Sequence, residues 1–160
     1  MVREFEDVII QTLARFLIPF VQLYSLYVLI HGHGSPGGGF QGGCILAASF
    51  ILIVIAYDLK EAKRRFPEKT LLIFCCLGVF IYAATGWACL LLGSNFLDYG
   101  VLSDILPTGH VKARYYGMAM IETGVEIAVM AVMFSIFLDL TTKGEHEGIL
   151  GETDAGVHHK

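Results

Sequence analysis

Two glutamates, Glu122 and Glu126, stand inside a long apolar segment of the sequence. Their spacing of four residues places both carboxyl groups on one face of an α-helix. Counted from Ala113 at 1.5 Å per residue, they lie roughly 14 and 20 Å along that helix. Two carboxylates so close in a low dielectric do not both stay ionised without a cation, so one binds a proton or the pair meets Lys, Arg or a metal ion. This chemistry suits a proton or Na⁺ path, and the alternative is a neutral glutamate that hydrogen-bonds between helices.

A third ionisable group, Arg15, lies about two helical turns into another apolar segment. Its side chain either extends to the membrane surface or pairs with a carboxylate of a neighbouring subunit. Its depth is in the opposite half of the membrane from Glu122, so no pair between these two residues is expected. Glu122, Glu126 and Arg15 are the candidates for an ion path.

The composition indicates what surrounds these groups. Hydrophobic residues make up 55% of the 160 residues and charged residues 16%, and the mean hydropathy is +0.64. Soluble proteins are about 45–50% apolar and about 25% charged. With a net charge of -4 as well, the chain is not expected to be a soluble domain, a disordered chain or a nucleic-acid-binding protein.

The apolar residues are collected into four runs, at about residues 8–30, 40–59, 70–92 and 113–138. Each is near the roughly 20 residues that an α-helix needs to cross a bilayer, and backbone polar groups in lipid require helical pairing. The sequence therefore predicts an all-α integral membrane protein of the cell membrane with four transmembrane helices. Residues 1–140 form this membrane domain, and residues 141–160 form a polar cytoplasmic tail.

The distribution of Lys and Arg predicts the orientation. Four crossings place both termini and the connector at residues 58–69 on one side, which carries eight basic residues against two on the other. The eight are Arg3, Lys60, Lys63, Arg64, Arg65, Lys69, Lys143 and Lys160, and the two are Lys112 and Arg114. Both termini are therefore predicted to be cytoplasmic.

The link between the first two runs is rich in glycine. It reads HGHGSPGGGFQGG over residues 31–43, which permits a tight, non-helical connection. Gly39 and Gly43 also have the small-xxx-small spacing that allows close helix contact, and Gly117 and Gly124 suggest a second such surface. His31 and His33 without a third ligand do not predict a metal site, and no resident cofactor is expected.

The core of this segment resembles the signature of the MnhB/MrpB family of small integral membrane subunits. The matching residues are Ser35, Pro36, Gly37, Gly38, Gly39, Phe40, Gln41, Gly42 and Gly43. The resemblance implies a non-catalytic subunit of a multisubunit Mrp-type Na⁺/H⁺ antiporter. It also implies partnership with other antiporter-module subunits, in a stand-alone antiporter or in a membrane-bound hydrogenase or related respiratory complex.

Three other functions stay open at this point. The chain is a structural adaptor whose glycine faces hold larger subunits together, or a four-helix transporter that works alone as a homodimer. An integral membrane enzyme is the least expected, because the sequence has no HExxH motif, no multi-His cluster and no nucleophile–base pairing.

Overall fold

The computed structural model describes residues 2–32, 36–57, 66–104, 107 and 109–141. Within these ranges the chain forms the α-helices α1 (Val2–Ile30), α2 (Gly39–Tyr57), α4 (Glu68–Leu91) and α5 (His110–Thr141), and the short 3-10 helix η1 (Tyr99–Asp104). All four α-helices are long and apolar enough to cross a bilayer. The prediction of an all-helical protein with four membrane-spanning helices is confirmed. The predicted tail beyond residue 141 and the connector at residues 58–65 lie outside the described residues.

The helix ends lie within three residues of the predicted spans, except that α1 begins at Val2, six residues before the predicted start. The last helix extends to both sides of the predicted 113–138, because His110, Val111 and Lys112 at its start and Asp139 to Thr141 at its end continue the helical hydrogen bonds. Its 32 residues make a helix roughly 48 Å long, which exceeds the roughly 30 Å of hydrocarbon in a bilayer. With 19 residues, α2 is just long enough to cross.

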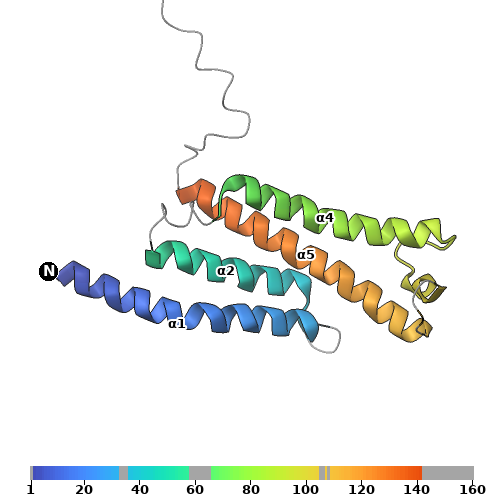
Figure 1. The fold of residues 1–160 in the computed structure, drawn as a ribbon, viewed down its shortest axis with the longest axis horizontal. Helices are drawn as coiled ribbons and strands as arrows, with labels where there is room; N and C mark the ends of the chain where they lie inside the picture. The colour runs from blue at the N-terminus through green and yellow to red at the C-terminus, as the bar shows by residue number, and fades with distance from the viewer. Residues whose placement is uncertain (1, 33–35, 58–65, 105–106, 108, 142–160) are drawn as a thin grey trace, which may run out of the picture.

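The four helices lie side by side in a row, as Figure 1 shows. Along the row the order is α1, α2, α5, α4: α1 packs chiefly on α2, α2 on α5, and α5 on α4. The two inner helices are therefore more buried than the two outer ones. Large apolar side chains remain exposed along the outer helices, among them Val8, Leu13, Phe16, Phe20, Ile73, Val79, Phe80 and Trp87. Such surfaces face lipid or other proteins.

The centre of the row is a crossing of α2 over α5 at backbone distance. A Cβ atom added to Gly39 would overlap the carbonyl oxygen of Glu122, and one added to Gly43 would lie 2.8 Å from the carbonyl oxygen of Glu126. Ala47 continues this surface of α2 and is buried. Small residues four apart allow this approach, so the predicted close-packing face on the second helix is confirmed.

The contact between α5 and α4 uses glycines from both helices. A Cβ atom on Gly78 would lie 2.5 Å from the carbonyl oxygen of Gly124, and one on Gly124 would lie 2.8 Å from that of Gly78. Gly117 lies against the ring of Tyr99 in η1, where a Cβ atom would be 2.7 Å from the side chain. The second predicted surface, on the last helix, thus packs inside this chain.

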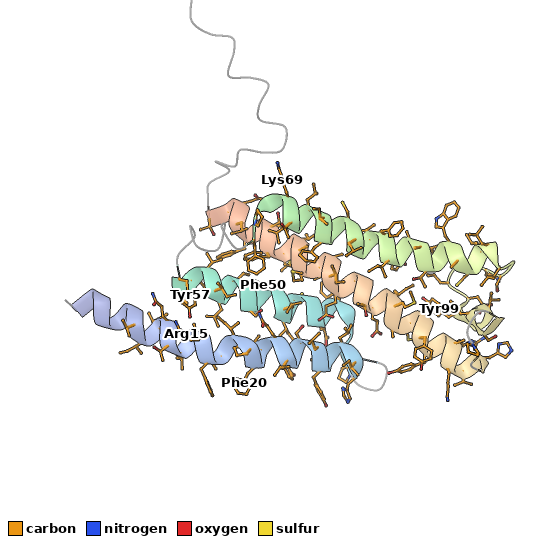
Figure 2. The ribbon with its side chains drawn as sticks, viewed as in Figure 1. Arg15, Phe20, Phe50, Tyr57, Lys69 and Tyr99 are labelled. Atoms are coloured by element: carbon orange, nitrogen blue, oxygen red, sulfur yellow. The ribbon has the colours of Figure 1, made fainter. Side chains whose placement is uncertain are left out.

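Larger side chains pack together where α2 and α5 end. Val54, Leu71, Phe134 and Leu138 form the buried apolar cluster there, with Phe50 and Phe66 packed against it. The rings of Phe50 and Phe66 are 4.7 Å apart, and both contact Phe134. Phe50 is labelled in Figure 2. This cluster joins three helices by side-chain packing, whereas the middle of the row is joined by backbone contact.

Asp98 organises the link between α4 and α5. The Ser94 hydroxyl donates a hydrogen bond of 2.8 Å to one carboxylate oxygen, and the Gly100 N–H donates one of 3.3 Å to the other. These bonds to the charged form, the Ser94 bond first, lower the pKa of Asp98 below its usual value. The carboxylate therefore holds the start of η1 in place.

Gly43→Ala is expected to destabilise the chain, because its new methyl group would meet the backbone of α5. The free energy of unfolding should fall by about 1–3 kcal/mol, measured by thermal unfolding of the purified chain in detergent. Gly109→Ala is the matched control: nothing lies within 4 Å of a Cβ atom there, so the change should stay within about 0.5 kcal/mol. Equal effects of the two substitutions would contradict the backbone contact.

Asp98→Asn is expected to lower stability at neutral pH and to have less effect in acid. Because the folded-state pKa of Asp98 is lowered, its stabilising effect is present above the unfolded pKa of about 3.9 and is lost as the pH falls through the lower folded value. The melting temperatures of wild type and variant, followed from neutral pH to about pH 3, should converge. A constant difference between them would be the contrary result, and Ser94→Ala should move the convergence to higher pH.

Candidate functional site at a three-helix crossing

Ser25 of α1 joins the backbone of α2 to the carboxyl group of Glu126 on α5. Its Oγ atom lies 2.7 Å from the carbonyl oxygen of Gly42 and 2.8 Å from Oε1 of Glu126. Ser25 is fully buried, and Glu126 is only 3% exposed. One buried hydroxyl group therefore connects three helices at the depth where the sequence places the acidic pair.

Glycine at position 42 provides the space for this carboxyl group. A Cβ atom there would lie 3.0 Å from Oε1 of Glu126 and 3.3 Å from the backbone oxygen of Ser25. Any side chain at this position would push α1 and the Glu126 carboxyl group away from α2. Gly42 thus leaves room for the carboxyl group of Glu126, whereas Gly39 and Gly43 allow the backbone of α5 to approach.

Glu122 lies one turn earlier on α5 and faces the glycine-rich link. Its carboxyl oxygens would lie 3.1 Å from a Cβ atom on Gly32 and 3.7 Å from one on Gly38. Gly38 directly precedes α2, and its φ angle of 145° is one that glycine adopts readily. The amino end of a helix favours a negative charge. Glu122 and Glu126 share a face of α5, as predicted, but they have different surroundings.

Arg15 does not join the acidic pair. Its Nε–H donates a hydrogen bond of 3.3 Å to the Tyr57 hydroxyl at the end of α2, and Tyr57 donates one of 3.4 Å to the carbonyl oxygen of Gln11. Figure 2 shows Arg15 and Tyr57 close together at the carboxyl end of α2. Ten residues separate Arg15 from Ser25 on α1, which is roughly 15 Å along the helix. The expectation that Arg15 and Glu122 do not pair within the chain agrees with this placement.

The family model described as "Domain related to MnhB subunit of Na+/H+ antiporter" matches residues 9–135 of the chain. The chain belongs to the MnhB family. The match covers α1 from residue 9 onward, all of α2 and α4, and α5 as far as residue 135, including Ser25, Glu122 and Glu126. The resemblance in the glycine-rich segment is therefore confirmed at the level of the family.

Named members of the MnhB family are similar over almost their whole length. The chain is 30% identical over 141 residues to a Na(+)/H(+) antiporter subunit of Bacillus subtilis (strain 168), covering 88% of this chain and 95% of the relative. It is 29% identical over 138 residues to the putative antiporter subunit mnhB2 of Staphylococcus epidermidis (strain RP62A), covering 84% and 94%. For the mnhB2 protein of Staphylococcus aureus (strain Newman) the identity is 27% over 136 residues. With its four apolar helices, this MnhB-family chain is a multi-pass protein of the cell membrane.

The glycine-rich signature of this MnhB-family chain contributes to the crossing through its second half. Gly39, Gly42 and Gly43 are buried in the first turns of α2, whereas Pro36, Phe40 and Gln41 are exposed and Gly37 is partly buried. Ser35 and His33 lie outside the described residues. The signature therefore supplies both the start of α2 and the small face that packs on the two glutamates.

The structure changes the basis of one alternative from the sequence, the structural adaptor. Glycine faces that hold larger subunits together were the basis of the adaptor hypothesis, but Gly39, Gly43, Gly117 and Gly124 pack within the chain. The spacing of small residues predicts a close approach of helices, and it does not say whether the partner helix belongs to the same chain. An adaptor would therefore need surfaces other than these four glycines to hold larger subunits.

Sequence reasoning missed Ser25 and Tyr57. A serine in an apolar span usually bonds a carbonyl of its own helix, so nothing in the local sequence marked Ser25 as different. The available signal was the acidic pair itself, because a buried carboxyl group requires polar partners on neighbouring helices. For Tyr57, the available signal was its hydroxyl group at the end of a span, where it can accept a hydrogen bond from Arg15.

Ser25→Ala is expected to destabilise the MnhB-family chain by about 1 kcal/mol, the scale of hydrogen bonds between membrane helices. The substitution removes the hydroxyl group shared by Gly42 and Glu126. Ser49→Ala is the matched control, because Ser49 is equally buried but donates to Leu46 of its own helix. Thermal unfolding in detergent measures both, and a larger loss in the Ser49 variant would contradict the proposed importance of the crossing.

Proposed function

We propose that the chain is a non-catalytic membrane subunit of a multisubunit Na⁺/H⁺ antiporter, and that its acidic pair belongs to the ion route of that assembly. Membership of the MnhB family and the names of the relatives as antiporter subunits support the first part. The observation that carries the second part is Glu126, a carboxyl group buried where three apolar helices meet.

The chemistry of the site fits proton or cation movement better than structural support alone. A carboxyl group at membrane depth is costly, roughly 2.5–3.5 kcal/mol for an acidic residue on insertion scales, and a serine or threonine would supply a hydrogen bond between helices at lower cost. Glu122 and Glu126 stand one turn apart on the same face. A proton or cation moving through the assembly would meet them in succession.

The arrangement of the helices fits a role among larger subunits. The outer helices α1 and α4 expose apolar side chains along the row, and the assembly partners would cover part of this surface. Both termini are placed in the cytoplasm by the distribution of basic residues. Stand-alone antiporters and the antiporter modules of membrane-bound hydrogenases or related respiratory complexes both offer such neighbours.

Glu126→Gln is expected to lower Na⁺-dependent proton exchange by roughly tenfold or more, because an amide cannot take up or release the proton. Exchange is measured in membrane vesicles that contain the complete complex. Asp139→Asn is the control, since it removes a carboxylate from the exposed end of the same helix and should leave exchange unchanged.

The composition of the complex is determined in the same preparations. Gentle detergent extraction should recover larger membrane subunits together with the wild-type chain and with both variants. Wild-type exchange by a fully assembled Glu126→Gln complex would refute the role in the ion route. Recovery of the chain alone, with exchange by the purified chain in liposomes, would favour the stand-alone homodimer instead.

A further inference from the structure

Ser25 differs from the other serine and threonine residues of the α-helices whose hydrogen bonds the structure gives. Thr12, Ser49, Thr85, Thr123 and Thr141 each donate to a carbonyl oxygen three or four residues earlier in their own helix. The Ser25 hydroxyl instead reaches two oxygen atoms on two other helices. Its position is therefore set by the groups on α2 and α5 that it joins.

The number of hydrogen atoms at this site limits which groups can donate a hydrogen bond. Three oxygen atoms meet here, with the Ser25 Oγ atom 2.7 Å from the Gly42 carbonyl oxygen and 2.8 Å from Glu126 Oε1. A serine hydroxyl has one hydrogen to donate, and a backbone carbonyl can only accept. If the hydroxyl donates to Gly42, the short contact to Glu126 requires a second hydrogen, and a protonated carboxyl group is the source of one.

The surroundings of Glu126 favour this neutral form. Neither Lys, Arg nor His forms an ion pair or hydrogen bond with it among the residues that the structure describes. α1 presents a hydroxyl group to it, and α2 presents the space left by Gly42. The titratable group one turn away is the acid Glu122. A charge without a cation is far more costly in such a place than a neutral, hydrogen-bonded acid.

We propose that Glu126 is the proton-holding member of the acidic pair: its carboxyl O–H donates to Ser25 Oγ, and the Ser25 O–H donates to the carbonyl oxygen of Gly42. Each of the two hydrogen atoms then has one acceptor, and the two hydrogen bonds join α1, α2 and α5. The proposed ligand of this site is H⁺, because the contact that the structure gives Glu126 Oε1 is a hydrogen bond to a hydroxyl group.

Release of the proton changes the contact between the helices. The proton leaves as H⁺ and a carboxylate remains, so one hydroxyl hydrogen is then shared between two acceptors, Gly42 and Glu126. One of the two hydrogen bonds is lost, and the contact of α1 with α2 and α5 weakens. The use of this proton rests on the proposed function, whereas its presence on Glu126 is independent of transport.

Infrared difference spectroscopy at neutral pH tests the proposal on the full-length chain, extracted together with its companion subunits. The spectrum of wild type minus Glu126→Gln should contain the C=O stretching band of a protonated carboxylic acid, which shifts in D₂O. Ser25→Ala should move that band, because the acid loses its acceptor. Glu122→Gln and Ser49→Ala are the matched controls and should leave it in place.

Loss of carboxylate bands in place of the acid band in Glu126→Gln would overturn the proposal, as would removal of the acid band by Glu122→Gln. The outcome is separable from that of the exchange measurement. An acid band together with normal exchange by Glu126→Gln would retain the proton and refute the ion route. Carboxylate bands together with lost exchange would support the role of Glu126 in the ion route and refute its protonated state.

Discussion

A carboxyl group buried among apolar helices has to find its hydrogen-bond partners inside the protein, and this requirement governs the middle of the structure. Glu126 finds Ser25 on α1, and Ser25 also bonds the α2 backbone. Three helices must therefore meet at one point and at short range. Other contacts lie on either side of this meeting point. The apolar cluster packs where α2 and α5 end, and Asp98 organises the link that precedes α5.

The short range is possible because the glycine-rich segment continues into α2. Gly39 and Gly43 bring the backbones of α2 and α5 together, and Gly42 leaves room for the carboxyl group. The same segment approaches the carboxyl oxygens of Glu122 through Gly32 and Gly38. One stretch of sequence thus shapes the surroundings of both glutamates, which explains physically why a glycine-rich link and an acidic pair belong to one site although some eighty residues of sequence, residues 43–122, lie between them.

The parts of the structure that could be predicted from the sequence follow from the solvent. Apolar runs of membrane length predict helices because unpaired backbone groups are excluded from lipid, and the spacing of Glu122 and Glu126 predicts a shared face. The order of the helices in the row could not be predicted, because a face of small residues indicates close packing without indicating which helix packs there. The partner of Glu126 was equally hidden, since a serine in a helix shows no sign in the local sequence of bonding outside it. For Arg15 the depth argument excluded Glu122, while Tyr57 became visible as a partner only when α1 and α2 were seen side by side.

The single row of helices gives the molecule two broad surfaces and hardly any interior (Figure 1). A wall one helix thick measures about 10–12 Å across, so every side chain in it lies within a few ångströms of one surface or the other. Proteins or lipid on the two broad surfaces are therefore separated by no more than the thickness of one helix.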